Sequence, residues 1–385
     1  MHLVTLPAQD KAFFAILKQQ TQLDGRDTRG RKHSLALVLM GVLMALCSGR
    51  DGNLSSLHRH MKNRFGALCR LVGQKAPNVI SRAQLPRLLA QVNQPVFAQL
   101  VLTHYGLVLG DDCSDWLSGD GKELRGSILK GKHRGEVCVS VMAQTDNSIV
   151  TQTYYNGTKE SERPAMSNLL ISNGLVNRKM VLDALHLTPA LLETIHQHKG
   201  SYLIGLKDNQ HHLLRLCIVR TMFVAPCYVR VEAPKRGHGR IEERTYACFP
   251  IGGLQTDSRW HKAGLTTLLR VQRIRCTLAG VELSRTDSFF VTNEQVETNQ
   301  QAELIYDAIR GHWGIETMHY RRDVVFAEDA CRSRISGLQR IMSSIRTLAL
   351  NLLHSLKPKN MAAQLDEFAD NFQYLFEFLK LKRVL

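Results

Sequence analysis

The sequence lacks the features of a disulfide-stabilised or membrane-spanning protein. Its nine cysteines are scattered, odd in number and contain no C-x-x-C pair, which argues against a disulfide framework and a structural zinc site. The longest apolar run, LALVLMGVLMALC at residues 35–47, is shorter than the roughly 20 residues that span a bilayer. We therefore expect a buried helix there, no membrane partner, and a location in the reducing cytoplasm.

Acidic residues are scarce relative to basic ones. The chain has 50 Lys and Arg against 34 Asp and Glu, which gives a formal net charge of +16. Such a balance is typical of proteins that bind a polyanion. Because the basic residues are spread through structured segments, nucleic acid is favoured over a membrane surface. The alternative is a basic protein that is merely well solvated.

The first part of the chain has the texture of short helices. In residues 1–110, Arg and Lys recur between apolar positions, and Ser81 is a plausible helix N-cap. We expect a helical N-terminal domain that binds DNA. A small helical bundle without any role in DNA binding would have the same texture.

The pattern changes after residue 110. Alternating β-branched and aromatic residues predict strands at EVCVSVMAQ and SIVTQTYY, followed by further strand and helix patterns through SYLIGLKDN. This order predicts an α/β core over residues 111–355, with its first strands antiparallel. Residues 224–300 are rich in strand patterns and read as a β-rich insertion. Residues 356–385 are predicted to form one amphipathic C-terminal helix.

Three carboxylates are candidates for a common site. Asp120 in LSGDGKELRGS and Asp183 in KMVLDALH are expected at strand ends, where α/β sheets hold functional groups. Glu316 lies in RGHWGIETMHYRR, a helix rich in cations and aromatics. Asp and Glu oxygens suit Mg²⁺ or Mn²⁺, and two such ions can assist phosphoryl transfer. The alternative is that these are ordinary solvated surface carboxylates.

Five segments occur in an order that is more specific than any one of them. They are GDGKELRGS, VLDALH, YLIGLKDNQ, KRGHGRIEERTY and IRGHWGIETMHYRRDVVFAEDACRSR. Together they resemble the ISAs-type insertion-sequence transposases and the related H-repeat-associated proteins, a branch of the DDE transposases. The resemblance implies an RNase H-like catalytic core with a β-rich insertion, and it matches Asp120, Asp183 and Glu316 to the catalytic, metal-binding triad.

The resemblance also implies an activity and partners. Such an enzyme would cleave double-stranded DNA at transposon terminal repeats in a metal-dependent reaction and join the ends to target DNA, as a homodimer when bound to DNA. One departure is that Thr317 follows Glu316 where the family usually has Asn, and the segment after it is one residue shorter. The alternatives are an inactive DNA-binding relic of a transposase and a metal-dependent nuclease that does not transpose.

Basic side chains near these motifs are predicted to contact DNA. The candidates are Lys122, Arg125, Lys130, Lys132, Arg134, Lys207, Asn209, Lys235, Arg236, His238, Arg240 and Arg310. Arg310 resembles the arginine of the family's tyrosine–arginine–glutamate signature, and an ordinary salt bridge is its alternative. We expect Trp313 to pack in the core, whereas Trp260, in the insertion, is a candidate for stacking on a flipped base.

A transition-metal site is a competing interpretation. His312, Glu316 and His319 are spaced so that they share one helical face. Gly311 and Gly314 weaken the expectation of a regular helix there. No further compact ligand cluster is found nearby in the sequence, so a zinc hydrolase is the less favoured alternative.

Overall fold

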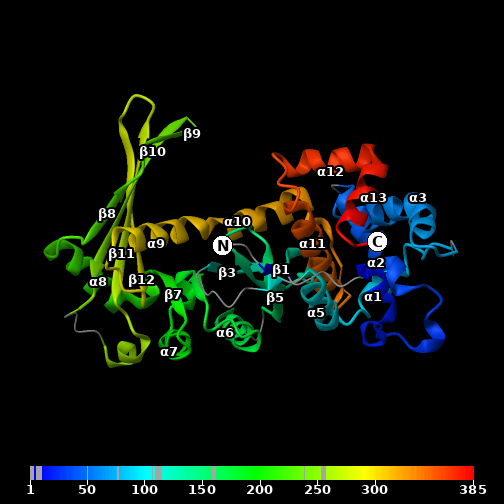
Figure 1. Cartoon of the computed structure of the whole chain (residues 1–385), viewed down its shortest axis with the longest axis horizontal. Coiled ribbons are helices and arrows are strands. Elements are labelled where there is room, and N and C mark those ends of the chain that lie inside the picture. Colours follow the sequence, from blue (N-terminus) through cyan, green and yellow to red (C-terminus); the bar gives the residue numbers. More distant parts are fainter. Residues whose placement is uncertain are drawn as a thin grey trace.

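The protein is described from a computed structural model of the whole chain (Figure 1). The structure describes residues 4–5, 11–49, 51–75, 78–105, 107–108, 115–157, 162–237, 239–252, 257–333 and 335–385. It is a mixed α/β fold in which one large sheet extends between two groups of helices. In the described residues, no helix is long and apolar enough to cross a membrane.

The sheet has ten strands, nine of them in the order β5-β4-β3-β6-β7-β12-β11-β10-β8, and β9 pairs with β10 at the edge. The five strands of the first half are β3 (Trp116–Glu123), β4 (Glu136–Ala143), β5 (Ile149–Asn156), β6 (Lys179–Leu182) and β7 (Ser201–Leu206). β3, β4 and β5 are antiparallel neighbours, whereas β6 is parallel to β3 and β7 is parallel to β6. The expected antiparallel start of an α/β sheet is therefore confirmed.

Helices connect and cover these strands. α6 (Glu162–Ser172) and α7 (Pro189–Gln197) lie between the core strands along the chain, and α8 (His211–Phe223) follows β7. Their apolar side chains, such as Met166 and Leu192, join one core cluster with the strands. Short turns of 3-10 helix come after β3, β6 and β7 at Arg125–Ser127, Ala184–His186 and Asp208–Gln210. The ends of the strands are thus fixed by compact turns.

Residues after α8 form the β-rich extension that the sequence predicts. It consists of β8 (Tyr228–Val231), β9 (Lys235–Gly237), β10 (Arg240–Pro250), β11 (Thr267–Thr277) and β12 (Glu282–Thr292). β12 returns to pair antiparallel with β7, so the extension continues the core sheet instead of forming a separate one. Its long strands project away from the rest of the molecule (Figure 1).

The extension leads into the helix that carries the third candidate carboxylate. α9 (Asn299–Gly311) begins with a capping box formed by Thr298 and Gln301, and α10 (Trp313–Tyr320) comes directly after it. A π-helical turn at Arg321–Val325 then continues the chain, with 3-10 turns at Ser258–Ala263 and Glu328–Ala330 elsewhere in this half. In Figure 1, α9 and α10 run across the molecule from the extension towards the N-terminal helices.

The N-terminal and C-terminal helices share one core. The N-terminal group comprises α1 (Phe13–Gln19), α2 (Leu35–Cys47), α3 (Leu54–Leu71), α4 (Leu85–Leu89) and α5 (Gln94–Tyr105), with 3-10 turns at Thr21–Leu23 and Thr28–Gly30. The strands β1 (Val4–Thr5) and β2 (Leu107–Val108) pair at its two ends. α2 is buried along its whole length, as its apolar run predicts, and it packs against α11 (Leu338–His354).

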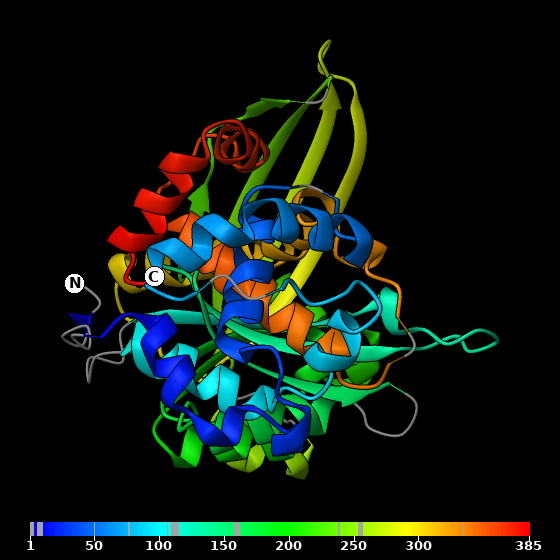
Figure 2. The ribbon, with the colours of Figure 1, turned by 90° about the vertical axis from the view of Figure 1, so that its right-hand side faces the viewer.

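The C-terminal segment differs from the expected single helix. It forms α12 (Met361–Asp370) and α13 (Phe372–Leu381), and the chain breaks at Asn371, whose side chain accepts a hydrogen bond from the Tyr374 N–H as a new N-cap. Both helices lie beside the N-terminal group (Figure 2) and bury their apolar faces in the same core. The first 110 residues therefore do not have a core of their own.

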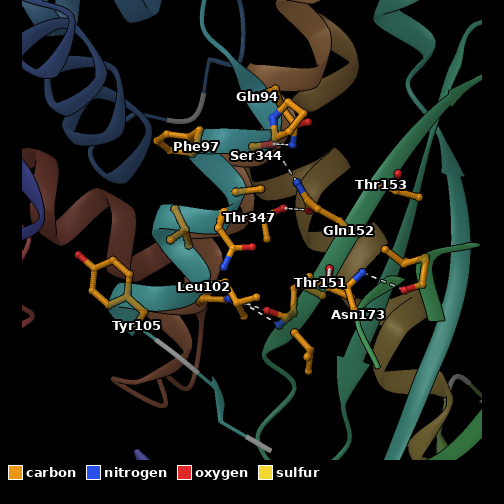
Figure 3. A pocket seen from close by; sticks show the side chains of 18 of the residues that line it. Gln94, Phe97, Leu102, Tyr105, Thr151, Gln152, Thr153, Asn173, Ser344 and Thr347 are labelled. Carbon is orange, nitrogen blue, oxygen red and sulfur yellow. Dashed lines mark hydrogen bonds between the residues drawn. The ribbon is translucent and has the colours of Figure 1, made fainter. Parts of the chain in front are cut away.

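A cavity of about 260 Å³ marks the joint between this helical group and the sheet edge. Figure 3 shows side chains from α5, β5 and α11 around it. Gln152 of β5 crosses the joint, donating to the Ser344 hydroxyl at 3.0 Å and accepting from Thr347 at 2.8 Å. None of the three candidate carboxylates lines this cavity, so it serves here as a structural joint and not as the candidate site.

Candidate active site

Asp120 lies within a strand and not at its end. β3 continues to Glu123, and Asp120 is paired with Ser140 of β4, so the expectation that Asp120 ends the strand is corrected. The strand passes straight through this position because both neighbouring glycines adopt extended backbone within the ladder. The side chain is 27% exposed, and its Oδ1 accepts a hydrogen bond from the Gly121 N–H at 2.8 Å.

Asp183 is the residue directly after β6. The register pairs Gly119 of β3 with Leu182 of β6 in parallel, which places Asp120 and Asp183 side by side at the next position. Asp183 caps the following 3-10 turn by accepting from the Ala184 N–H at 2.7 Å. Lys207, from the end of β7, contacts the same carboxylate oxygen at 3.0 Å. The adjacency that the sequence analysis required of these two aspartates is therefore present.

Glu316 is exposed on α10. One turn further along the helix, His319 reaches the sheet, and its Nδ1 lies 3.4 Å from Oδ2 of Asp120. Residues three apart are neighbours on a helix, so Glu316 lies about one turn from His319. The structure thus brings α10 to Asp120 through His319, and Glu316 is exposed on the same helix.

Two residues of this cluster were missed by sequence reasoning. Glu162, in the first turn of α6, packs against Gly121 so closely that a Cβ at position 121 would overlap its carboxylate. His186 is fully buried, and its Nε2 lies 3.2 Å from Oε1 of Glu162. An acid at the start of a helix is common in sequences, and no local signal shows that this one packs against Gly121, the residue after Asp120.

The cluster is negatively charged and poor in compensating cations. Burial, together with the charges of Glu162 and Asp183, raises the pKa of Asp120 to about 7, although the Gly121 N–H opposes this. Asp183 behaves differently: burial acts to raise its pKa, but the Lys207 ammonium and the Ala184 N–H outweigh it, so the pKa is lowered. Lys207 therefore compensates Asp183, and Asp120 is left with like charges around it.

His312, at the N-terminus of α10, and His319, within α10, are both neutral at pH 7. Burial lowers the pKa of His312 to about 4 despite the charge of Asp183, which acts in the opposite direction. Burial and the charges of Arg322 and Lys122 lower the pKa of His319 to about 3. The contact between His319 and Asp120 is consequently a polar contact of a neutral imidazole, not an ion pair.

The donor set fits a hard divalent cation better than zinc. Asp120 and Asp183 occupy neighbouring positions in register and offer carboxylate oxygens, the ligands that Mg²⁺ and Mn²⁺ prefer. Within the described part of the chain, no group of three His, Cys, Asp or Glu side chains is arranged to hold one ion. Mg²⁺ keeps several waters and needs only one or two carboxylates. A compact zinc site of His312, Glu316 and His319 is not formed among the described residues.

Lys122, which the sequence analysis predicted to contact DNA, is a structural residue. Side chains alternate along a strand, so Lys122 faces the same way as Asp120, and there it is covered by the chain after α10. Its side chain is only 8% exposed, and its Nζ lies 2.6 Å from Asp323 and 3.9 Å from Glu328. An ammonium held in this way is not available to a phosphate.

The burial of the two candidate tryptophans is the reverse of what the sequence suggested. Trp260 is buried in the core formed by β7, β10 and α7, so its proposed stacking on a base is wrong. Trp313, expected in the core, is 43% exposed. The guanidinium groups of Arg244 and Arg310 lie 4.3 and 5.1 Å from its ring centroid. Arg310 also lies 3.7 Å from Glu232, the salt bridge considered as its alternative.

The other basic candidates lie on loops and at strand ends. Arg125, Lys130, Lys132, Arg134, Lys207, Asn209, Lys235 and Arg236 are exposed, Arg240 is partly exposed, and His238 lies outside the described residues. The Asn209 amide donates to the Ala184 carbonyl at 2.7 Å, so it supports the turn after Asp183. Arg125, Lys130 and Arg332 line an open hollow of about 610 Å³ together with Asp329.

Comparison with known proteins places the chain in a class. The family model described as "Transposase DDE domain" matches residues 129–352, more than half of the chain, and the chain belongs to this family of DDE transposases. The match includes Asp183 and Glu316 and begins after Asp120. The resemblance to insertion-sequence transposases stated from the motifs is confirmed.

Individual proteins are also similar to this chain. The chain is 24% identical over 341 residues to the H repeat-associated putative transposase YhhI of Escherichia coli K12, covering 86% of this chain and 87% of YhhI. It is 27% identical over 247 residues to the putative transposase YncI of Escherichia coli O157:H7, covering 62% and 61%. A cryo-EM structure of the piggyBac transposase synaptic complex with hairpin DNA covers 96% of this chain and 80% of that chain, with a TM-score of 0.43 and 10% identity.

Proposed function

We propose that this transposase hydrolyses DNA at the ends of an insertion sequence and transfers the freed 3′-hydroxyl ends to target DNA, using Mg²⁺ or Mn²⁺. The observation that carries the proposal is that Asp120 on β3 and Asp183, directly after the parallel strand β6, occupy neighbouring positions in register. The order and directions of β3 to β7 are those expected of an RNase H-like core, and this supports the same conclusion.

Asp120 and Asp183 would hold the ions, and Glu316 would complete the site. Bound there, divalent ions would supply activation of the attacking oxygen and stabilisation of the leaving oxygen in phosphoryl transfer. Glu316 is exposed one turn from His319, so its carboxylate has to turn towards the aspartates when DNA covers α10. His319 holds Asp120 in place, and Lys207 keeps Asp183 ionised.

DNA would lie along the cationic side chains around this site. Arg125, Lys130, Lys132 and Arg134 come after β3, while Lys235, Arg236 and Arg240 lie at the start of the projecting strands. His238, a further candidate, lies outside the described residues. Arg310 would support the strand near Trp313. Exposed Arg59 and Lys62 on α3 offer the N-terminal helices a surface for the terminal repeats. Synapsis of two DNA ends implies a homodimer on DNA.

The test is cleavage of DNA that carries the ends of the element, in Mg²⁺ and in Mn²⁺. Asp120→Asn, Asp183→Asn and Glu316→Gln should each reduce cleavage to background while DNA binding persists, because removing negative charge cannot weaken attraction to phosphate. Lack of cleavage by the unmutated protein in either metal would favour the inactive relic. Cleavage without joining of the ends would favour a nuclease.

The short segment after Glu316 offers a second test of the relic alternative. A deletion in a helix rotates the residues after it by roughly 100° relative to those before it, and Thr317 precedes His319, which contacts Asp120 here. If the unmutated chain is inactive, insertion of one residue after Thr317 should restore cleavage. If the unmutated chain is active, the same insertion should abolish cleavage, since it would rotate His319 away from Asp120.

A further inference from the structure

Glu162 stands in the wall of the candidate site, although it belongs to none of the motifs that define the family resemblance. Its side chain is 19% exposed, at the first turn of α6. Its carboxylate occupies the space where a side chain at position 121 would begin. Position 121 directly follows Asp120, so Glu162 lies against the backbone that carries the first aspartate.

The surroundings of Glu162 are not those of an ordinary helix-start acid, which would extend into water. Its partner His186 is fully buried, and the Nδ1 of His186 has no hydrogen-bond partner in the described ranges. The Nε2 of His319, on the other side of Asp120, is likewise buried without one over these ranges. In each ring the nitrogen without a partner among the described residues is the one turned away from the contacted carboxylate, because Nδ1 and Nε2 of an imidazole point in diverging directions. Glu162 is set apart by its buried partner His186 and by its position against Gly121.

Burial raises the pKa of the Asp120 carboxylate, and the charges of Glu162 and Asp183 both act on it and raise its pKa further. Lys207 is bound to Asp183, and Lys122 is bound to Asp323. Like charges in a partly buried site repel each other, and a divalent cation removes that repulsion. A Cβ at position 121 would overlap the carboxylate carbon of Glu162, so a larger residue there would push that carboxylate aside.

We propose that Glu162 is a further acidic residue of the metal site and holds the ion near Asp120 through one of the ion's water ligands. The role is a positioning one, because no three acidic or imidazole side chains of the described residues meet at one point and Mg²⁺ retains water. This inference rests on the proposed metal-dependent function and adds to it a residue outside the Asp–Asp–Glu triad.

The test measures Mn²⁺ binding to the full-length chain without DNA, by isothermal titration calorimetry. Glu162→Gln keeps the shape of the side chain and removes its charge, and it should weaken Mn²⁺ binding about ten-fold or more. Glu162→Asp should recover part of the loss. Gly121→Ala keeps every carboxylate but displaces Glu162, and should weaken binding as Glu162→Gln does.

Glu136→Gln is the matched control. Glu136 is also 19% exposed and also has a nitrogen partner, Arg340 at 2.8 Å, but it lies at the start of β4 and not at Asp120. Its Mn²⁺ binding should equal that of the unmutated chain. Circular dichroism identifies any variant that fails to fold; if Gly121→Ala is one, the two Glu162 variants decide the matter.

Asp120→Asn separates this inference from the proposed function. If Asp120→Asn weakens Mn²⁺ binding and Glu162→Gln leaves it unchanged, the role of Glu162 is wrong and the metal site stands. If Asp120→Asn also leaves binding unchanged, the metal site itself is wrong and the role of Glu162 is lost with it. If Asp120→Asn and Glu162→Gln each weaken Mn²⁺ binding about ten-fold while Glu136→Gln does not, the metal site and the role of Glu162 are both supported.

Discussion

His319 of α10 contacts Asp120 of β3, with 3.4 Å between Nδ1 and Oδ2. The contact joins the helix that carries Glu316 to the strand that carries the first aspartate. Because burial and nearby cations lower the pKa of His319 to about 3, the imidazole stays neutral and orients the carboxyl group without neutralising it. Partners of metal ligands act in this way in many metal sites.

His319→Phe should therefore reduce cleavage without unfolding the protein. We expect a loss of about ten- to a hundred-fold, which is typical when a residue that orients a metal ligand is removed. Thr317→Ala, on the exposed side of the same helix, is the control and should retain activity. Equal activity of His319→Phe and the unmutated chain in a cleavage assay would show that the contact has no role in orienting Asp120.

The raised pKa of Asp120 predicts a pH-dependent stability in the absence of metal. The folded pKa of about 7 lies above the ordinary value of 3.8, so folding favours the protonated form. The stabilisation is complete below about pH 4 and is lost as the pH rises to about 7, by at most about 4 kcal/mol. Asp120→Asn cannot ionise and should not show this loss.

Urea unfolding in EDTA at pH 5 and pH 8 measures this difference. The free energy of unfolding of Asp120→Asn, minus that of the unmutated chain, should be larger at pH 8 than at pH 5. Mn²⁺ should reverse the order at pH 8, because the ion stabilises only the chain that binds it. A difference that is the same at both pH values would contradict the assignment of a repelled, partly buried carboxylate.

The loop after β3 should account for part of the salt dependence of DNA binding. Lys130 and Lys132 are exposed, whereas Lys122 is buried in ion pairs. Replacing both loop lysines by alanine should reduce the log–log salt slope by about 0.9 for each lost phosphate contact. Lys122→Met should lower stability and leave the slope unchanged. If folded Lys122→Met showed a smaller salt slope of DNA binding than the unmutated chain, Lys122 would be a DNA contact after all.

The sequence predicted the strands and the buried helix well because their patterns are local. Alternation indicated β4 and β5, and the apolar run indicated α2. The pairing of Asp120 with Asp183 followed once β3 and β6 were neighbours, which the family resemblance supplied and composition could not. Lys122 was misassigned because the pattern of β3 shows which residues share a face, but not which segment covers that face.

Contacts between distant segments account for the other differences. Glu162, in the first turn of α6, packs against Gly121 of β3 although the two are far apart in the chain, and the glycine is the local trace of that contact. The burial of Trp260 and Trp313 is the reverse of the expectation because burial depends on the helix packed opposite each ring. The C-terminal helix broke at Asn371 because a cap residue inside an apolar stripe can begin a new helix.

A buried network behind the site gives the last prediction. Glu328 is 2% exposed and binds the fully buried Arg322 through two contacts of 2.9 and 2.7 Å. Arg346, also fully buried, and Lys122 lie 4.0 and 3.9 Å from the same carboxylate. These charges, led by that of Arg322, outweigh burial and lower the pKa of Glu328, so the group is ionised at neutral pH.

Glu328→Gln should cost about 3–5 kcal/mol in the free energy of unfolding, because it leaves buried cations without their common partner. Glu377→Gln, an exposed change on α13, should stay within about 0.5 kcal/mol. The double variant Arg322→Met with Glu328→Gln should recover part of the loss, since one unpaired charge is then removed. Urea unfolding measures all three. If Glu328→Gln costs no more than Glu377→Gln, the network does not hold β3 against the chain after α10.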